Sequence, residues 1–449
     1  MNGGPAGPLT RRGFLALAGT AAVAGCSGDA PPRTPPGTVA DDYEHPTPRG
    51  DPSWEAPATA PTVDVAVEPL VRNLEIPWDI AFSGTGELFV TQRTGSVVTL
   101  DAGRVSNVAQ PRDAIDADAL APGSDRSPWW VDGGEGGTLG IAVHPAYPDE
   151  PWVYVYYTAS TGAGKRNRVV RFDVSAPDPN ETEEVVVGGI PANKFHNGGR
   201  ICFGPDGNLW VCTGDAGVPE RARDPASLAG KILRVAPDGK APSSNPDLDG
   251  DPRVFTVGHR NPQGIDWLPG GVPVISEHGP GGRDEVNLLR PGADYGWNDV
   301  RAGPDAAGEE FAAYPAHDDV VPPVLNTGLG TSWAPTGATF YTGRDFPAWR
   351  HRFVVGGLIS QCIWVVTLTP PDATSPPLGE SGRRFDADWL HPAFTATAHP
   401  VLADELGRVR HVAQSPAGEL YAITSNRDGR ASDPFPRERD DVLVRLRAA

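Results

Sequence analysis

A histidine and a carboxylate stand at the two ends of a predicted β-hairpin. His196 lies in the string Phe-His-Asn-Gly-Gly-Arg, which precedes a short apolar strand and a Pro-Asp-Gly-Asn turn, and Asp215 ends the strand after this turn. Because a hairpin returns its end to its start, we expect His196 and Asp215 to be neighbours. A carboxylate fixes the tautomer of an imidazole and raises its basicity, which suits a general base. A structural hydrogen bond at the rim of the fold is the alternative.

Two segments rich in glycine and proline could hold a cation farther along the chain. One spans residues 258–264, and the other spans residues 276–287 and contains Asp284 and Glu285. Gly and Pro let the backbone turn its carbonyls inward, and the two acids add anionic oxygens, which are the ligands that Ca²⁺ prefers. The sequence contains no EF-hand loop, and a solvated acidic turn is the alternative.

Short β-strands are expected to position these residues. A sequence pattern of a turn followed by a strand recurs along the chain. The recurrence, roughly every 55 to 80 residues over six units, predicts an all-β, six-bladed β-propeller over residues 63–449. Radial repetition protects the sheet edges and gathers loops around a central channel. A two-sheet β-sandwich is the alternative. The copies lie at residues 84–92, 205–215, 269–277 and 416–425, with weaker copies at 152–157 and 352–357.

Composition agrees with an acidic all-β protein. The 449 residues include 54 Gly, 49 Pro and 1 Met, which suits many short strands joined by tight turns. The formal net charge is −19. Because nucleic-acid binding needs a basic face, we expect no nucleic-acid partner.

The first 26 residues resemble an export signal. Arg11 and Arg12 precede an apolar run, as in a twin-arginine signal peptide, and the run ends at Cys26 in a string that resembles a lipobox. We therefore predict a lipidated Cys26, a disordered Pro-rich tether over residues 27–62, and a cell-envelope lipoprotein or extracellular protein. No other apolar run is long enough to span a bilayer, so the lipid is the expected membrane contact. Ordinary cleavage beside an unmodified cysteine is the alternative.

Two cysteines flank the predicted turn of the hairpin. An oxidising compartment would permit a disulfide between Cys202 and Cys212. A shift of one residue in strand register would place the two side chains on opposite faces of the sheet. The sequence leaves this pairing open.

The strings described above, in this order, resemble the glucose/sorbosone dehydrogenase family, especially its soluble aldose dehydrogenase branch with a Glu-His-Gly-Pro loop. The resemblance runs from Leu70 to the end of the chain and includes residues 134–140 and 407–410. It implies a six-bladed propeller that holds the quinone cofactor PQQ and Ca²⁺ over the channel mouth. It also implies oxidation of a sugar, an aldose, at its anomeric hydroxyl to give a lactone. No haem-attachment motif is present, so electrons would leave to a separate acceptor.

The resemblance implies roles for the residues that match. His196 would take the proton of the anomeric hydroxyl as hydride passes to the quinone, Asp215 would orient His196, and Arg260 would stabilise the arriving charge. Arg408 and Arg410 would pair with the carboxylates of PQQ. The expected cofactor-binding residues are Glu135, Arg260, Asn261, His278, Gly279, Arg408 and Arg410.

The resemblance also implies two calcium positions. The backbone carbonyls of Gly279 and Pro280 would hold the ion that binds and polarises PQQ. Glu285 and Tyr295 match positions of a second, structural calcium site. The expected metal ligands are therefore these four residues.

Two positions depart from the family pattern. Glu135 replaces a glutamine that contacts the cofactor, and Ile359 replaces a lysine that anchors PQQ. The loss of a buried charge pair can cost several kcal/mol of binding. Two other functions therefore stay open, a non-enzymatic propeller that binds a carbohydrate or a protein, and a calcium-dependent lactonase. Trp78, Trp297 and Trp333 are predicted to pack in the core or rim.

Overall fold

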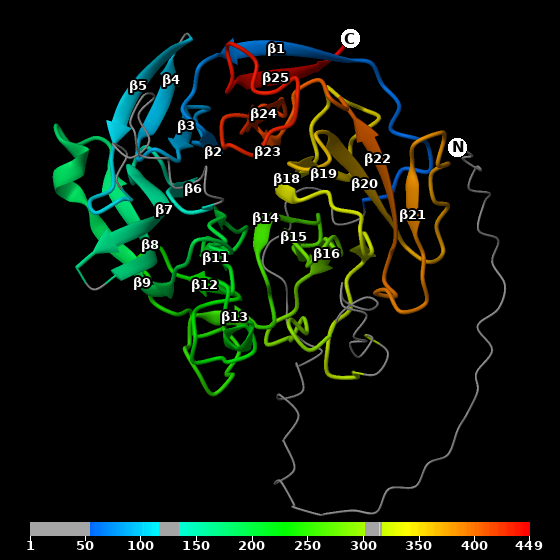
Figure 1. Ribbon diagram of the computed structural model, residues 1–449, viewed down its shortest axis with the longest axis horizontal. Helices are drawn as coiled ribbons and strands as arrows, with labels where there is room; N and C mark the ends of the chain where they lie inside the picture. Colours follow the sequence, from blue (N-terminus) through cyan, green and yellow to red (C-terminus); the bar gives the residue numbers. More distant parts are fainter. Residues whose placement is uncertain (1–53, 102, 116–133, 163, 301–313, 315–316) are drawn as a thin grey trace, which may run out of the picture. The chain divides into compact units, whose positions relative to one another are not determined.

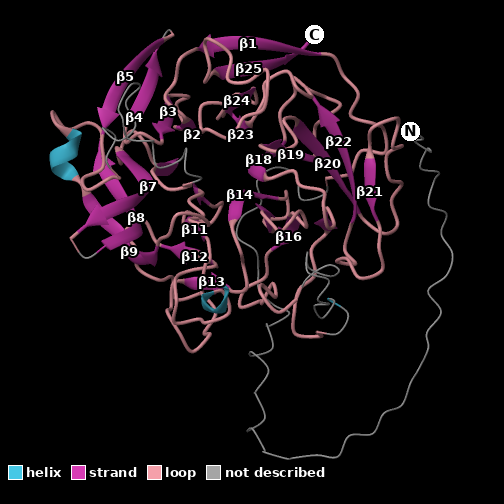
Figure 2. Ribbon diagram, viewed as in Figure 1, coloured by secondary structure: helices cyan, strands magenta, loops and turns pink. Residues whose placement is uncertain are grey.

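The computed structural model consists of antiparallel β-sheets joined by loops (Figure 1). In the described part of the chain the helices are two short 3₁₀ turns, η2 (Pro179–Thr182) and η3 (Pro219–Arg221) (Figure 2). No helix of this part is long and apolar enough to cross a membrane. The predicted all-β class is confirmed, whereas the predicted signal peptide and the lipidation of Cys26 lie outside the described residues. The structure describes residues 54–101, 103–115, 134–162, 164–300, 314 and 317–449.

Four of the sheets each contain four antiparallel strands in chain order. In the first of these sheets the innermost strand is the more buried and the outermost the more exposed, as the sequences Pro-Trp-Asp-Ile-Ala-Phe in β2 and Arg-Val-Ser-Asn-Val-Ala in β5 illustrate. The strands are β2 (Pro77–Phe82), β3 (Leu88–Gln92), β4 (Val97–Asp101), β5 (Arg104–Ala109); β6 (Thr138–Val143), β7 (Trp152–Thr161), β8 (Gly164–Asp173), β9 (Glu184–Pro191); β10 (Ile201–Phe203), β11 (Leu209–Thr213), β12 (Lys231–Val235), β13 (Val254–Thr256); and β14 (Pro262–Trp267), β15 (Pro273–Glu277), β16 (Glu285–Leu288), β17 (Leu325–Asn326).

The fifth sheet has nine strands in the order β1-β25-β24-β23-β18-β19-β20-β22-β21. β18 and β23 join its two parts through one parallel residue pair, Gly337 with His411. β1 pairs antiparallel with β25, so strands from the two ends of the propeller domain lie side by side (Figure 1). The strands are β1 (Val65–Val71), β18 (Pro335–Tyr341), β19 (Arg352–Gly357), β20 (Ile363–Thr369), β21 (Arg383–Phe385), β22 (Thr395–Val401), β23 (Val409–Gln414), β24 (Leu420–Thr424) and β25 (Leu443–Ala448).

The innermost strands contact one another in a closed circuit. β2 contacts β6, and the contacts continue through β10, β14, β18 and β23, which returns to β2. Sheets that surround a common axis in this way form a β-propeller, so the predicted propeller fold is confirmed. Each second strand runs antiparallel to the first and returns to the end where the first begins. Residues before the first strands and after the second strands therefore gather at one end of the circuit.

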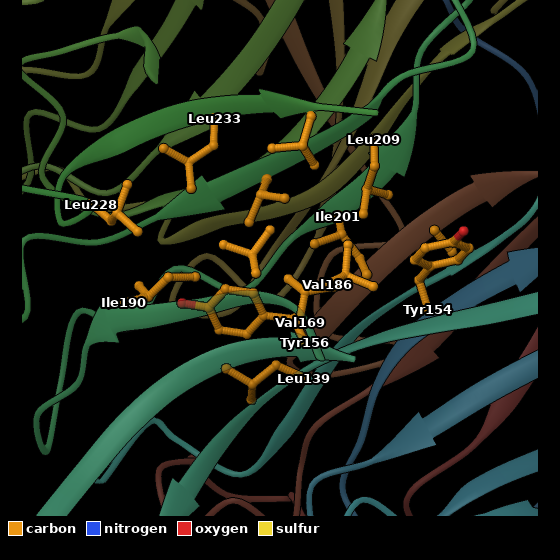
Figure 3. Close-up of a cluster of buried hydrophobic side chains, with 14 of the residues drawn as sticks. Leu139, Tyr154, Tyr156, Val169, Val186, Ile190, Ile201, Leu209, Leu228 and Leu233 are labelled. Carbon is orange, nitrogen blue, oxygen red and sulfur yellow. The ribbon is translucent and has the colours of Figure 1, made fainter. Parts of the chain in front are cut away.

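Apolar side chains between neighbouring sheets hold the circuit together. One cluster joins the sheet β6–β9 to the sheet β10–β13 and includes the buried residues Leu139, Tyr156, Ile201 and Leu233 (Figure 3). Full burial of one side chain of this size contributes roughly 1.5–3 kcal/mol. The hydroxyl of Tyr156 donates to the carbonyl of Asn197 across 2.7 Å, which ties this core to the loop that carries the predicted base.

The contacts of the domain begin before its predicted boundary. Residues 27–62 are predicted as a disordered tether, but Trp54 packs edge-on against Phe340 with ring centroids 5.3 Å apart. The indole of Trp349 also donates to the carbonyl of Pro61 across 2.9 Å. The Pro-rich composition of this segment predicts disorder, but the segment contains Trp54. The contacts of this large aromatic side chain hold the segment against the domain.

Cys202 and Cys212 are not bonded to each other. Cys202 pairs across the hairpin with Trp210, while the backbone N–H of Cys212 donates to the carbonyl of Arg200 across 2.8 Å. The two cysteines are therefore offset along the hairpin, and no disulfide joins them. This resolves the pairing that the sequence leaves open.

Candidate active site

His196 and Asp215 lie together at the end of the circuit where the first strands begin. His196 is in the loop before β10, and Asp215 follows β11. Nδ1 of His196 lies 2.8 Å from Oδ1 of Asp215; the carboxylate is buried, whereas the imidazole keeps 16% of its exposure. Because a carboxylate oxygen accepts, Nδ1 carries the proton and Nε2 is the basic nitrogen.

The backbone of His196 adopts a left-handed conformation. Its φ is 58°, and a residue other than glycine pays about 1 kcal/mol or more for this region. The backbone N–H donates to Oε2 of Glu135 across 2.8 Å, and the carbonyl accepts from the N–H of Ala216 across 3.1 Å. These two hydrogen bonds hold the main chain of His196 in the left-handed conformation and so fix the direction of its imidazole.

Trp297 joins this pair to the next loop. Its indole Nε1–H donates to Oδ2 of Asp215 across 2.8 Å, while Oδ1 also accepts from the N–H of Gly217 across 2.7 Å. The guanidinium of Arg260 lies over the Trp297 ring, 5.4 Å from its centroid. The sequence predicts Trp297 as a packing residue, but the structure makes it part of the site. Its place in a loop of glycines, between two polar strings, was the signal available in the sequence.

Glu277 fixes the loop that carries Arg260 and Asn261. Its Oε1 accepts from the backbone N–H of both residues, and its Oε2 lies 2.9 Å from Nδ1 of buried His259. Burial lowers the pKa of the Arg260 guanidinium, whose Nη1 donates to the carbonyl of His278 across 3.1 Å. The sequence pattern does not single out Glu277 as a site residue, although Glu277 belongs to the Glu-His-Gly-Pro string.

One hollow at this end of the circuit, the arginine pocket, carries excess positive charge. Arg93, Arg410 and Arg430 line it together with the carboxylates of Glu135 and Asp428. Burial lowers the pKa of Arg410 to about 9, and its Nε has no hydrogen-bond partner among the described residues. A buried cation with an unsatisfied donor favours an anionic ligand. The other lining residues are Trp78, Asn197, Gly198, Asn261, Gln263, His278 and Leu358.

Arg408 lies behind this pocket. Its Nη2 forms an ion pair with Oδ2 of Asp428 across 2.8 Å, and its Nη1 donates to the carbonyl of Leu358 across 3.3 Å. Asp428 and Leu358 line the arginine pocket, and Arg408 does not. Of the two arginines predicted to bind carboxylates, Arg410 lines the pocket and Arg408 supports a lining residue.

The two residues that depart from the family pattern differ in their surroundings. Glu135 lines the arginine pocket, and its Oε1 accepts from Nη1 of Arg430 across 3.0 Å. Burial raises the pKa of Glu135, but Arg430 and the backbone N–H of His196 outweigh it and lower the pKa overall. Glu135 is therefore ionised. Ile359 is 60% exposed and does not line the pocket.

A second hollow, the loop pocket, adjoins the first and shares His278 with it. Burial lowers the pKa of His278 to about 4, so this imidazole is neutral. Its Nε2 donates to the carbonyl of Pro335 across 2.8 Å. All four predicted metal ligands line this pocket. Its lining includes Arg260, Glu277, Gly279, Pro280, Glu285, Tyr295 and Trp297.

Three of the four residues proposed for calcium, Pro280, Glu285 and Tyr295, already have protein partners for their oxygens. The carbonyl of Pro280 accepts from Nη1 of Arg283 across 2.9 Å. Oε1 of Glu285 accepts from the hydroxyl of Tyr314 across 2.7 Å, and burial raises the pKa of Glu285 to about 7. The hydroxyl of Tyr295 donates to a carbonyl in β16 across 2.6 Å. Within the described ranges, no group of three or more His, Cys, Asp and Glu is placed to hold a metal ion.

The fold and site define an all-β propeller with a histidine–carboxylate pair beside a pocket suited to an anion. The sequence pattern of the glucose/sorbosone dehydrogenase family matches residues 74–433, so the chain belongs to this family. The predicted family is confirmed. Membership of this family places the chain among relatives that are named as sugar dehydrogenases.

Individual relatives share about a quarter to a third of their residues with the chain. The aldose sugar dehydrogenase of Escherichia coli K12 is 27% identical over 396 residues, which cover 86% of this chain and 95% of that protein. Quinoprotein glucose dehydrogenase B of Acinetobacter calcoaceticus is 30% identical over 296 residues, 59% of this chain and 58% of that protein. The PQQ-bound aldose sugar dehydrogenase of Streptomyces coelicolor superposes with a TM-score of 0.63 at 30% identity, over 87% of this chain and 99% of that chain.

Proposed function

We propose that this protein oxidises an aldose at its anomeric hydroxyl to a lactone, with PQQ as cofactor. The single observation that carries the proposal is the His196–Asp215 pair, which Glu135 connects to the arginine pocket. Membership of the family and likeness to a PQQ-bound aldose sugar dehydrogenase support it.

The residues of the pair have complementary roles. When bound, PQQ would supply a quinone that accepts hydride from the sugar. Nε2 of His196 accepts the hydroxyl proton, because Asp215 holds the other ring nitrogen as an N–H donor. The carboxylate of Asp215 then stabilises the imidazolium. Arg260 places a positive charge beside the site, where negative charge arrives with the hydride.

The arginine pocket fits a ligand with several carboxylates. Arg410 offers a planar fork of N–H donors that matches a carboxylate in two-point contact. Asn261 and Glu135 line the same hollow, and His278 lies between it and the loop pocket. We assign these residues, with Gly279 and Arg260, to cofactor binding, and Arg408 to the support of Asp428.

Calcium is proposed at the carbonyls of Gly279 and Pro280, with Glu285 and Tyr295 at a second, structural position. Because Ca²⁺ takes about six to eight oxygen ligands and this position offers two carbonyls, the first ion would need anionic oxygens of PQQ as further ligands. We therefore expect Ca²⁺ and PQQ to bind together.

We propose six blades, because a division of the nine-stranded sheet at the Gly337–His411 pair leaves each innermost strand at the start of one blade.

We also propose that the protein is exported, that Cys26 carries its lipid anchor, and that a separate carrier accepts the electrons.

The test is dye-linked oxidation of a panel of aldoses by the purified protein after incubation with PQQ and Ca²⁺. We expect activity that requires both additions and that falls by about 10²–10⁴-fold in His196→Ala. His144→Gln is the control, since this histidine lines neither pocket. Hydrolysis of a sugar lactone without an electron acceptor would instead favour the lactonase. Absence of both activities and of PQQ binding would favour a binding propeller.

A further inference from the structure

Arg430 lies at the mouth of the arginine pocket. Its side chain keeps 39% of its exposure, whereas that of Arg410, in the same lining, keeps 8%. Arg430 follows β24, the second strand of its part of the nine-stranded sheet, and so reaches the end of the circuit where the site gathers. A ligand that enters from solvent would therefore meet Arg430 before it meets Arg410.

Glu135 holds this guanidinium in place. Its Oε1 accepts from Nη1 of Arg430 across 3.0 Å, and its Oε2 accepts from the backbone N–H of His196 across 2.8 Å. One carboxylate thus positions both the cation at the mouth and the predicted base. Glu135 and Arg430 are 295 positions apart in the sequence, so their contact exists only in the folded propeller.

The lining retains a positive charge after this pair is formed. Its described residues include three arginines, Arg93, Arg410 and Arg430, against two carboxylates, Glu135 and Asp428, which leaves an excess of one positive charge among them. A guanidinium carries five N–H donors in a planar fork and can contact more than one carboxylate. An anionic ligand would relieve the remaining repulsion among the arginines.

We propose that Arg430 is a binding residue that contacts an anionic group of the cofactor, and that Glu135 positions it for this contact. The inference rests on the proposed function and adds a residue to it. It also accounts for both departures from the family pattern. The negative charge of Glu135 is offset by its ion pair with Arg430. Arg430 also places a positive charge at the pocket mouth, which Ile359 cannot do.

Equilibrium dialysis of PQQ against the purified protein in the presence of Ca²⁺ tests this assignment without measuring turnover. We expect Arg430→Gln to weaken PQQ binding by about tenfold or more, because it removes a charged hydrogen bond to the ligand. Arg430→Lys should recover part of the loss, since it restores the charge but not the fork. Added NaCl should weaken the wild type more steeply than Arg430→Gln, because salt screens an exposed ion contact.

Arg437→Gln is the matched control. Arg437 is an exposed arginine in the same connection to β25; its Nη1 donates to the carbonyl of Glu405, and it lines neither pocket. Its PQQ affinity should stay within about twofold of the wild type. Thermal melting of each variant separates weakened binding from loss of folding. If Arg430→Gln does not fold, Arg430→Lys decides the matter, and an affinity equal to that of the wild type overturns the inference.

The outcomes separate this inference from the function on which it rests. Wild-type protein that binds PQQ, with an affinity that Arg430→Gln leaves unchanged, overturns the role of Arg430 and leaves the proposed function standing. Wild-type protein that retains no PQQ overturns both.

Discussion

Trp297 and Asp215 are joined by a hydrogen bond from the indole Nε1–H to Oδ2 across 2.8 Å. The other oxygen of Asp215 faces Nδ1 of His196. The indole therefore determines which carboxylate oxygen meets the imidazole. Because Asp215 is fully buried, its carboxylate depends on such donors in place of water.

Trp297→Phe keeps an aromatic ring beneath Arg260 but removes the N–H donor. We expect kcat of the enzyme loaded with PQQ and Ca²⁺ to fall about tenfold or more, because a hydrogen bond to a charged group contributes about 1.5–3 kcal/mol. Trp152→Phe, outside both pockets, is the control. An unchanged kcat would contradict a positioning role for Trp297.

Glu277 should act through the backbone that it holds. Glu277→Ala removes the acceptor for the N–H groups of Arg260 and Asn261 and the partner of His259. We expect kcat/KM to fall by about 10- to 100-fold, since buried donors lose their acceptor. Glu277→Gln keeps one acceptor oxygen and should retain most of the activity. Equal losses in the two variants would show that the charge, and not the hydrogen bonds to the loop, is what matters.

The strands were predictable because their signals are local. The four stronger repeats each contain the second strand of a sheet, as residues 84–92 contain β3 and residues 205–215 contain β11. Glycine in the turn and β-rich apolar residues after it specify such a strand without distant contacts. The same rule of hairpin closure places His196 beside Asp215.

The contacts between loops of different sheets could not be predicted in this way. Trp297 meets Asp215 across 82 positions, and Arg430 meets Glu135 across 295. These pairs depend on the order in which the sheets are arranged around the axis. Local hydrophobic periodicity in the sequence does not determine this order. Trp54 was missed for a related reason, because its partners lie on β18 and beyond, far from the Pro-rich segment that contains it.

A buried lysine holds the segment between Asp215 and β12. The Nζ of Lys231 donates to the carbonyls of Arg221, Ala222 and Ala229 across 2.7, 2.8 and 2.7 Å. Lys231→Met leaves these carbonyls without their donor, so we expect the free energy of unfolding to fall by about 3 kcal/mol or more in urea denaturation. The control is Lys240→Met, whose side chain is 83% exposed and should change stability by less than about 0.5 kcal/mol. Similar losses in both variants would contradict this role.

Asp441 should make stability depend on pH. Burial and the neighbouring Asp440 raise the pKa of Asp441 from 3.8 to about 7, against hydrogen bonds that lower it, including that from the backbone N–H of Asn426. The folded state therefore keeps a proton that the unfolded chain releases, so this contribution to stability is full below pH 3.8 and is lost as pH rises to about 7.

Asp441→Asn cannot release this proton. Between pH 5 and 8 we expect its free energy of unfolding to decline by about 2–3 kcal/mol less than that of the wild type, as measured by denaturant titration at each pH. Asp372→Asn, at an exposed carboxylate, should decline like the wild type. If Asp441→Asn follows the wild-type decline, Asp441 is ionised in the folded protein at pH 5, and its burial is compensated by the hydrogen bonds to its oxygens.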